Sequence, residues 1–234
     1  MKLKYVLSTA LLLAISGSAA AQSHQYRLNG NLNDDFGGPA LVSAGGSLSA
    51  NDYSFGKNQG LKMDVALGGV YTVDMSFHLN NLGGYQKIVD FSNLASDTGM
   101  YAYGTKWSFY PDAAALSSLA NGVDARLTLT RDAASMVTMY VNGAQIASFN
   151  DSSNHANFGS NPAHFFMDDV ATNKAEAGVG AVDYIRTYDH ALNASQVASM
   201  TAPVPEPETY AMLLAGLGLF AGIARKRKQV EQAD

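Results

Sequence analysis

The sequence has 234 residues, with 15 Lys and Arg against 20 Asp and Glu, which gives a formal net charge of −5. Because the chain contains no cysteine, it forms no disulfide and offers no thiolate to zinc, to an iron–sulfur cluster or to nucleophilic catalysis. The acidic balance disfavours general binding to phosphate backbones, so we expect no nucleic-acid partner. The length is sufficient for one large domain with its own hydrophobic core.

The amino terminus has the order of a secretory signal peptide. Two lysines precede a mostly apolar run over residues 5–15, and small residues follow as far as Ala21. The apolar run is too short to span a bilayer as a permanent anchor. We therefore predict that residues 1–21 are a signal peptide and that signal peptidase cuts between Ala21 and Gln22.

The carboxyl terminus predicts a membrane segment. Residues 201–208 form a proline-containing linker, and the uncharged residues 209–224 would make roughly 24 Å of helix, against a bilayer core about 30 Å thick. We predict one short transmembrane helix with a basic tail in residues 209–228. Since clustered cations stay on the cytoplasmic side, we expect residues 229–234 to be a cytoplasmic tail.

The linker, the short apolar helix and the basic cluster, in that order at the end of the chain, resemble the PEP-CTERM sorting signal of Gram-negative bacteria. The resemblance implies processing near the Pro-Glu-Pro sequence by an exosortase, a membrane protease-transpeptidase. It also implies a producer of exopolysaccharide that forms biofilms or flocs. The sorting residues carried over by position are Pro205, Glu206, Pro207, Arg225, Lys226 and Arg227. We expect export across the inner membrane, transient anchoring there, and a final location at the cell surface or in the extracellular matrix.

The residues between these two ends have the composition and periodicity of β-structure. They contain fifteen Asp but a single Glu, which favours strands and loops over helices. Apolar and polar residues alternate over Tyr71–Leu79 and over Ala125–Thr130, as in half-buried strands. The Asn142-Gly143 sequence between two further alternating runs predicts a tight hairpin. Weaker strand candidates are Gln25–Leu28, Leu61–Val65, Gln86–Phe91, Met100–Tyr103, Lys106–Tyr110, His164–Met167 and Ala181–Tyr188.

These features predict an all-β domain over residues 22–200. A dozen or so short strands with few helices favour a two-sheet antiparallel sandwich. One short helix is expected near the end of the domain, capped by Asn193, with Gln196 three residues on and Val197 facing inward.

Three stretches of this domain resemble LamG-like domains of the concanavalin A-like lectin/glucanase superfamily. Residues 26–34 resemble the opening of such domains, residues 127–132 and 139–143 the two central strands and their hairpin, and residues 180–192 with 195–197 the closing strand and its turn into a short helix. The resemblance implies a jelly roll whose first and last strands pair. It does not fix a ligand, because this fold carries many functions.

We predict that the domain is not an enzyme. Glycosidases on this scaffold carry a Glu-x-Asp-x-x-Glu or Glu-x-Asp-x-Glu strand, because cleavage of a glycosidic bond needs two carboxylates at a set separation. Glu176 is the single Glu of the domain, and no such strand is present. The first hypothesis is binding to extracellular polysaccharide. The alternative is a structural or protein-binding matrix protein without a glycan ligand.

A structural calcium ion is the one cofactor that the sequence raises. Many LamG-like domains hold calcium where the two chain ends meet, and by position this implies Asp34 and Asp183 as ligands. Asp168, Asp169 and Glu176 form a second candidate set. For both sets the alternative is that the carboxylates cap turns by accepting backbone hydrogen bonds, which we favour for the second set.

Aromatic residues are the candidates for stacking on sugar rings. Alternation along residues 106–110 places Trp107 and Phe109 on one face, and we expect both in the core, because large aromatic side chains dominate sandwich cores. The sequence does not show whether the side chains of Tyr101, Tyr103 and Tyr110 face the core or the solvent. We therefore predict no ligand-binding residue.

Overall fold

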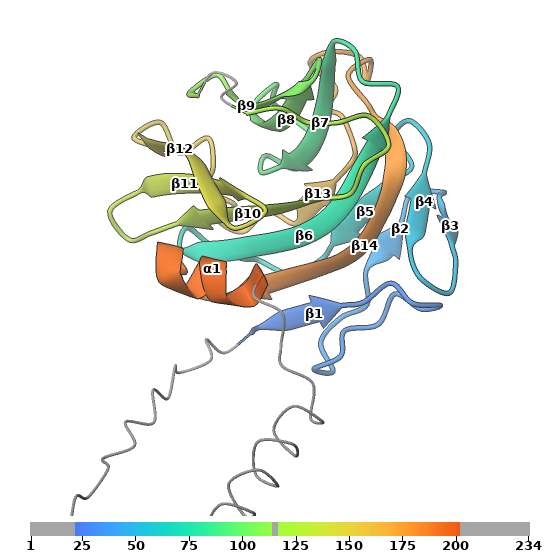
Figure 1. The fold of residues 1–234 in the computed structure, drawn as a ribbon, viewed down its shortest axis with the longest axis horizontal. Helices are drawn as coiled ribbons and strands as arrows, with labels where there is room; N and C mark the ends of the chain where they lie inside the picture. The colour runs from blue at the N-terminus through green and yellow to red at the C-terminus, as the bar shows by residue number, and fades with distance from the viewer. Residues whose placement is uncertain (1–21, 114–116, 202–234) are drawn as a thin grey trace, which may run out of the picture. The chain divides into compact units, whose positions relative to one another are not determined.

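The computed structural model describes residues 22–113 and 117–201, which form a sandwich of two antiparallel β-sheets (Figure 1). The chain divides into two compact units, Met1–Ala198 and Ser199–Asp234, and the second is described only over residues 199–201. The predicted signal peptide and the membrane segment lie outside the described residues. Among the residues that are described, no helix has the length and apolar character needed to cross a membrane.

The first sheet has eight strands and carries the longest strands of the fold. Their spatial order is β12-β11-β10-β6-β14-β4-β3, and β1 also pairs with β14. The strands are β1 (His24–Tyr26), β3 (Ser47–Leu48), β4 (Tyr53–Phe55), β6 (Tyr71–Asn80), β10 (Ala125–Arg131), β11 (Met136–Val141), β12 (Ala144–Asn150) and β14 (Val179–Tyr188).

The second sheet has six strands in the order β2-β5-β13-β7-β8-β9, and it forms the other layer of the sandwich (Figure 1). Its strands are β2 (Val42–Ser43), β5 (Leu61–Met63), β7 (Tyr85–Asp90), β8 (Gly99–Tyr103), β9 (Lys106–Tyr110) and β13 (Ala163–Phe165). The two-sheet antiparallel sandwich expected from the sequence is therefore confirmed.

The core lies between the sheets, where the alternation along each strand predicts it. The apolar residues of β6, from Tyr71 to Leu79, are all buried. Trp107 and Phe109 are fully buried as expected, and Trp107 meets Phe77 edge to face with ring centroids 5.9 Å apart. Such aromatic pairs add to the free energy gained by burial of the rings alone.

The opposite face of β6 differs in its first half from the expected half-buried strand, because the polar residues Thr72 and Asp74 are buried as well, whereas Ser76 and His78 are half-buried. Asp74 is buried and accepts hydrogen bonds from Arg126 Nε and Thr128 Oγ1, both at 2.7 Å. Thr72 donates a 2.8 Å hydrogen bond to the carbonyl of His190, in the segment that follows β14. The alternation predicts the strand, but it does not predict that residues far away in the sequence pack over its polar face and bury it.

The two ends of the domain behave as expected. β1 pairs antiparallel with β14, with Gln25 opposite Arg186, so the first and last strands meet. Helix α1 (Ala194–Thr201) begins after Asn193, whose Oδ1 accepts a 3.0 Å hydrogen bond from the Gln196 amide, while the Asn193 amide donates to Gln196 Oε1 at 2.9 Å. These reciprocal bonds are the predicted capping box.

The β11–β12 hairpin turns at Asn142-Gly143, as predicted. Both residues have positive φ, 51° and 82° respectively, and Val141 pairs directly with Ala144. The Asn142 side chain also accepts a 2.9 Å hydrogen bond from the Arg126 amide of the neighbouring strand. The turn is therefore fixed both by its backbone and by a contact with β10.

We expect Gly143→Val to lower the free energy of unfolding by more than about 1 kcal/mol, because a β-branched residue is strained at positive φ. Gly143→Asn should cost much less, since asparagine tolerates this conformation. Urea unfolding of the two variants measures the difference. Equal stability of Gly143→Val and Gly143→Asn would show that the left-handed backbone does not limit this position.

Candidate functional site

Four tyrosines gather on the face of the second sheet that points away from the core. Tyr85 on β7 lies opposite Tyr103 on β8, and Tyr101 and Tyr110 share this face, because they alternate with core residues. The Tyr85 ring lies 4.4 Å from Tyr103, 5.6 Å from Tyr101 and 5.9 Å from Tyr110, measured between centroids. Tyr103 is 50% exposed and Tyr110 is 39% exposed, so aromatic surface is open to solvent here.

A cavity of about 210 Å³ opens beside these rings, lined by Tyr85, Tyr110, Asp97 and Glu176. A second cavity of about 330 Å³ shares Tyr85 and is also bordered by Ala175 and Ala177, the neighbours of Glu176. Its other lining residues are Lys57, Asn80, Asn81, Gly83, Gly84, Gln86 and Val179. We call these two cavities, together with the ring of Tyr103 that packs against Tyr85, the tyrosine groove.

The second cavity offers hydrogen-bonding groups. Gln86 donates through Nε2 to the Asn81 carbonyl at 3.0 Å, whereas its buried Oε1 has no partner among the described residues. A buried carbonyl without a donor is costly, so a hydroxyl or a water molecule at this position would stabilise it.

A buried cluster of charged side chains lies next to the tyrosine groove. The fully buried Lys87 ammonium donates hydrogen bonds to Asp169, to Asp90 at 3.2 Å and to the Ser96 carbonyl at 3.1 Å. The Tyr101 hydroxyl donates to Asp97 at 2.9 Å, and Lys87 lies 5.1 Å from the Tyr101 ring centroid. Lys87 therefore links β7 to the loop before β14 that carries Glu176.

Glu176 has the most perturbed carboxyl in the groove. Burial raises its pKa, and the nearby charges of Asp97, Asp168 and Asp169 raise it further, to about 7, although Lys87 acts in the opposite direction. Burial also raises the pKa of Tyr85, with smaller contributions from Tyr103, Tyr110, Glu176 and Asp97. The groove thus holds more negative charge than its single buried lysine neutralises.

The raised pKa of Glu176 predicts a pH-dependent stability. Between its ordinary value of 4.5 and about 7, the folded protein holds a proton that the unfolded chain has lost, so this group's contribution to stability falls as the pH rises. Glu176→Gln should therefore raise the melting temperature more at pH 8 than at pH 5. An equal shift at both pH values would show that Glu176 titrates normally.

The structure holds Asp34 and Asp183 in separate hydrogen-bond networks. Both Asp34 oxygens accept bonds, from the amides of Gln25, Phe36 and Gly38 and from the His24 ring. Asp183 lies at a β-bulge in β14 and accepts a 2.6 Å bond from Ser76 Oγ. The contacts of Asp34 are those of the turn-capping alternative.

The second sequence-derived set is divided between two roles. Asp168 accepts from Thr172 Oγ1 and from the Glu176 amide, each at 2.7 Å, and Asp169 accepts from the amides of Ala171 and Thr172. Both aspartates therefore accept backbone hydrogen bonds in the loop before β14, which is the turn-capping role favoured for this set. Glu176 instead lines the tyrosine groove.

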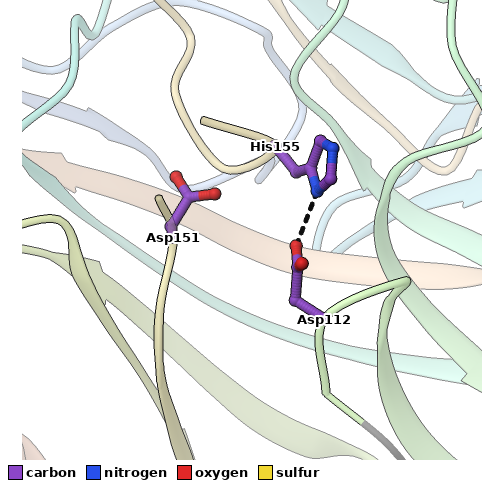
Figure 2. Close-up of side chains that lie close together, drawn as sticks. All are labelled: Asp112, Asp151 and His155. Atoms are coloured by element: carbon purple, nitrogen blue, oxygen red, sulfur yellow. Dashed lines mark hydrogen bonds and ion pairs between the residues drawn. The ribbon is translucent and has the colours of Figure 1, made fainter. Parts of the chain in front are cut away.

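Within the described ranges, one group has metal-ligand spacing, and the sequence did not indicate it. Figure 2 shows Asp112, Asp151 and His155, whose ligand-type atoms lie within 4.8 Å of one another. His155 Nδ1 lies 2.8 Å from Asp112 Oδ2, whereas Asp151 Oδ2 accepts a 2.7 Å bond from Arg131 Nε. Because Arg131 already neutralises Asp151, we interpret the group as part of the Arg131 network.

A larger cavity of about 550 Å³ lies beside the other sheet, along β4, β6 and β14. Its aromatic lining consists of Phe55, which is buried, and His78, which is paired with Asp124 at 2.7 Å. It therefore lacks the exposed rings that distinguish the tyrosine groove.

Residues 203–228 match the family model of the PEP-CTERM protein-sorting motif. The chain carries this sorting motif. The match confirms the expectation from the linker, the apolar segment and the basic cluster, and it indicates an exported protein that is anchored by a sorting signal before exosortase processing. No curated protein matches the sequence.

Solved structures share the sandwich. Trypanosoma rangeli sialidase in its covalent complex with 2,3-difluorosialic acid has a TM-score of 0.60 and 17% identity over 77% of this chain, which spans only 32% of the sialidase chain. Domain 4 of AbnA, a GH43 extracellular arabinanase from Geobacillus stearothermophilus, in complex with arabinotriose, has a TM-score of 0.57 and 16% identity, covering 79% of this chain and 100% of that domain.

A third structure is the CBM40 domain of the Ruminococcus gnavus IT-sialidase bound to α2,3-sialyllactose. It has a TM-score of 0.50 and 11% identity, with 69% of this chain and 100% of that chain covered. At these identities the likeness shows the fold alone. The three structures confirm the expected sandwich, and they are sialidase and carbohydrate-binding domains that are not specifically LamG-like.

Proposed function

We propose that this protein is an exported, exosortase-processed surface or matrix protein whose non-catalytic sandwich binds extracellular polysaccharide in the tyrosine groove. The observation that carries the proposal is the exposed cluster of Tyr85, Tyr103 and Tyr110 beside a cavity with polar side chains. Aromatic faces cover the apolar faces of sugar rings, while carboxylates and amides bond to their hydroxyl groups. The arabinotriose and sialyllactose complexes of two structural neighbours support a sugar-binding use of this fold.

A glycan array probed with the purified full chain in mild detergent tests this proposal. We expect binding to at least one polysaccharide, and we expect it in EDTA as well as in calcium, since no groove residue belongs to the calcium set Asp34 and Asp183. Absence of binding to every glycan in both buffers would favour the structural or protein-binding alternative.

The same sample separates binding from hydrolysis. Asp97 and Glu176 line one cavity, and two carboxylates flanking a glycosidic bond are also the machinery of glycosidases. Asp97, however, is held by the Tyr101 hydroxyl, and the domain has no strand of the glycosidase type. Incubation with each bound polysaccharide should release no reducing ends. Their release, and its loss in Glu176→Gln, would make the groove an active site.

A further inference from the structure

The cavity between Tyr85 and Tyr110 is acidic. Its lining includes Asp97 and Glu176 and, among the described residues, no lysine or arginine. Asp168 and Asp169 lie close enough to Glu176 to raise the pKa of its carboxyl. The cation within this cluster, Lys87, is fully buried and already shared by Asp90 and Asp169.

Other lysines lie at the margins. Lys106 is opposite Tyr103 where the β8–β9 pair ends, and Lys57 borders the second cavity, not the first. Lys174 belongs to the loop that carries Glu176, and its backbone amide bonds to the Asp169 carbonyl at 2.9 Å. None of the three lines the cavity that holds Asp97 and Glu176.

We propose that this acidic cavity takes the ammonium group of an amino sugar, so that the preferred ligand is a polysaccharide with free amines. The inference rests on the proposed glycan-binding function and adds the chemical class of the sugar. The rings of Tyr85 and Tyr110 line the same space as the two carboxylates. Cations bind over tyrosine faces, and carboxylates hold an ammonium by charge-assisted hydrogen bonds.

Each of the two cavities contacts a different sugar residue of such a polysaccharide. The acidic cavity binds the amine of one residue, while the neighbouring cavity meets an adjacent residue with neutral groups, Asn80, Asn81 and Gln86. Uronic and sialic acids are disfavoured, because their carboxylates would face Asp97 and Glu176.

A matched pair of ligands tests the inference: chitotetraose, with free amines, and its fully N-acetylated form, which has the same backbone and no charge. Near pH 6.5, calorimetry should give about tenfold tighter binding of the free amine, because its ammonium favours the ionised over the protonated form of Glu176 and binds beside Asp97 and the aromatic rings. Raising the salt concentration from about 0.05 to 0.5 M should weaken this binding more than that of the acetylated form, because salt screens charges.

Three variants assign the effect to the cavity. Glu176→Gln and Asp97→Asn should each remove most of the preference for the free amine while leaving the affinity for the acetylated form within about twofold. Asp64→Asn, which removes one negative charge from a surface pair with Lys62, should leave the preference intact. Equal loss in all three variants would mean that only the net charge of the protein matters, and it would overturn the cavity assignment.

The outcomes keep the two proposals apart. If the glycan array shows binding to neutral or acidic glycans but not to free amino sugars, the amino-sugar inference is wrong and the proposed function stands. If no glycan of any charge binds, both fail. Tighter binding of the acetylated tetramer than of the free amine would also overturn the inference.

Discussion

Lys87→Met should lower the free energy of unfolding of the sandwich by about 3–5 kcal/mol, the cost of removing one partner from a buried ion pair. The Lys87 ammonium is fully buried between Asp90 and Asp169, and methionine would leave both carboxylates without a cation. The loss should be greater at neutral than at acidic pH, because protonation relieves unpaired carboxylates. Denaturant unfolding at pH 5 and pH 8 measures both effects.

Lys62→Met is the matched control. Lys62 lies on a strand of the same sheet, but its pair with Asp64 is solvent-exposed, so this change should cost at most about 1 kcal/mol. Similar losses for Lys62→Met and Lys87→Met would mean that the buried cluster contributes no more than a surface ion pair.

Replacement of Pro205, Glu206 and Pro207 by alanine should retain the full-length protein in the inner membrane. The predicted signal peptide is unchanged, so we expect export to continue, whereas alanine removes the proline constraint on φ and the Glu206 carboxylate on which we expect processing to depend. Cell fractionation with antibodies against the sandwich and against the carboxyl-terminal tail follows both parts of the chain. We expect both antibodies to label the same full-length membrane species.

Pro203→Ala is the control for a general effect of proline loss in this linker, and it should be processed as the unchanged protein is. If the triple variant loses its tail and reaches the cell surface as efficiently as Pro203→Ala, the Pro-Glu-Pro sequence does not determine sorting.

Most of the fold is predictable from the sequence, because alternation and turn chemistry are local. β6, β10 and the β11–β12 hairpin follow from the period of two and from Asn142-Gly143. The sequence predicts β1, β5 and β13 but not the equally short strands β2, β3 and β4, because strands of two or three residues carry little periodic signal. The positions of these three strands come from pairing, of β2 with β5, of β4 with β14 and of β3 with β4.

The site was far less predictable. Alternation places Tyr101 and Tyr103 on the same face of one strand, but only the register of β8 and β9 brings Tyr110 to that face. Nothing local brings Glu176 to that face, since it arrives on a loop more than 60 residues later in the chain. The resemblance implies Asp34 as a calcium ligand. The sequence cannot show that backbone amides already donate hydrogen bonds to both oxygens of the Asp34 carboxylate.

Affinity electrophoresis in gels that contain a polysaccharide identified by the glycan array tests the central claim most directly. Tyr103→Ala, which removes a half-exposed ring at little structural cost, should weaken retardation of the full chain by about tenfold in apparent affinity, as loss of an aromatic anchor does. Phe36→Ala removes a 56% exposed ring from the loop after β1 and should migrate as the unchanged protein does. Equal retardation of the unchanged protein and both variants would contradict a polysaccharide site in the tyrosine groove.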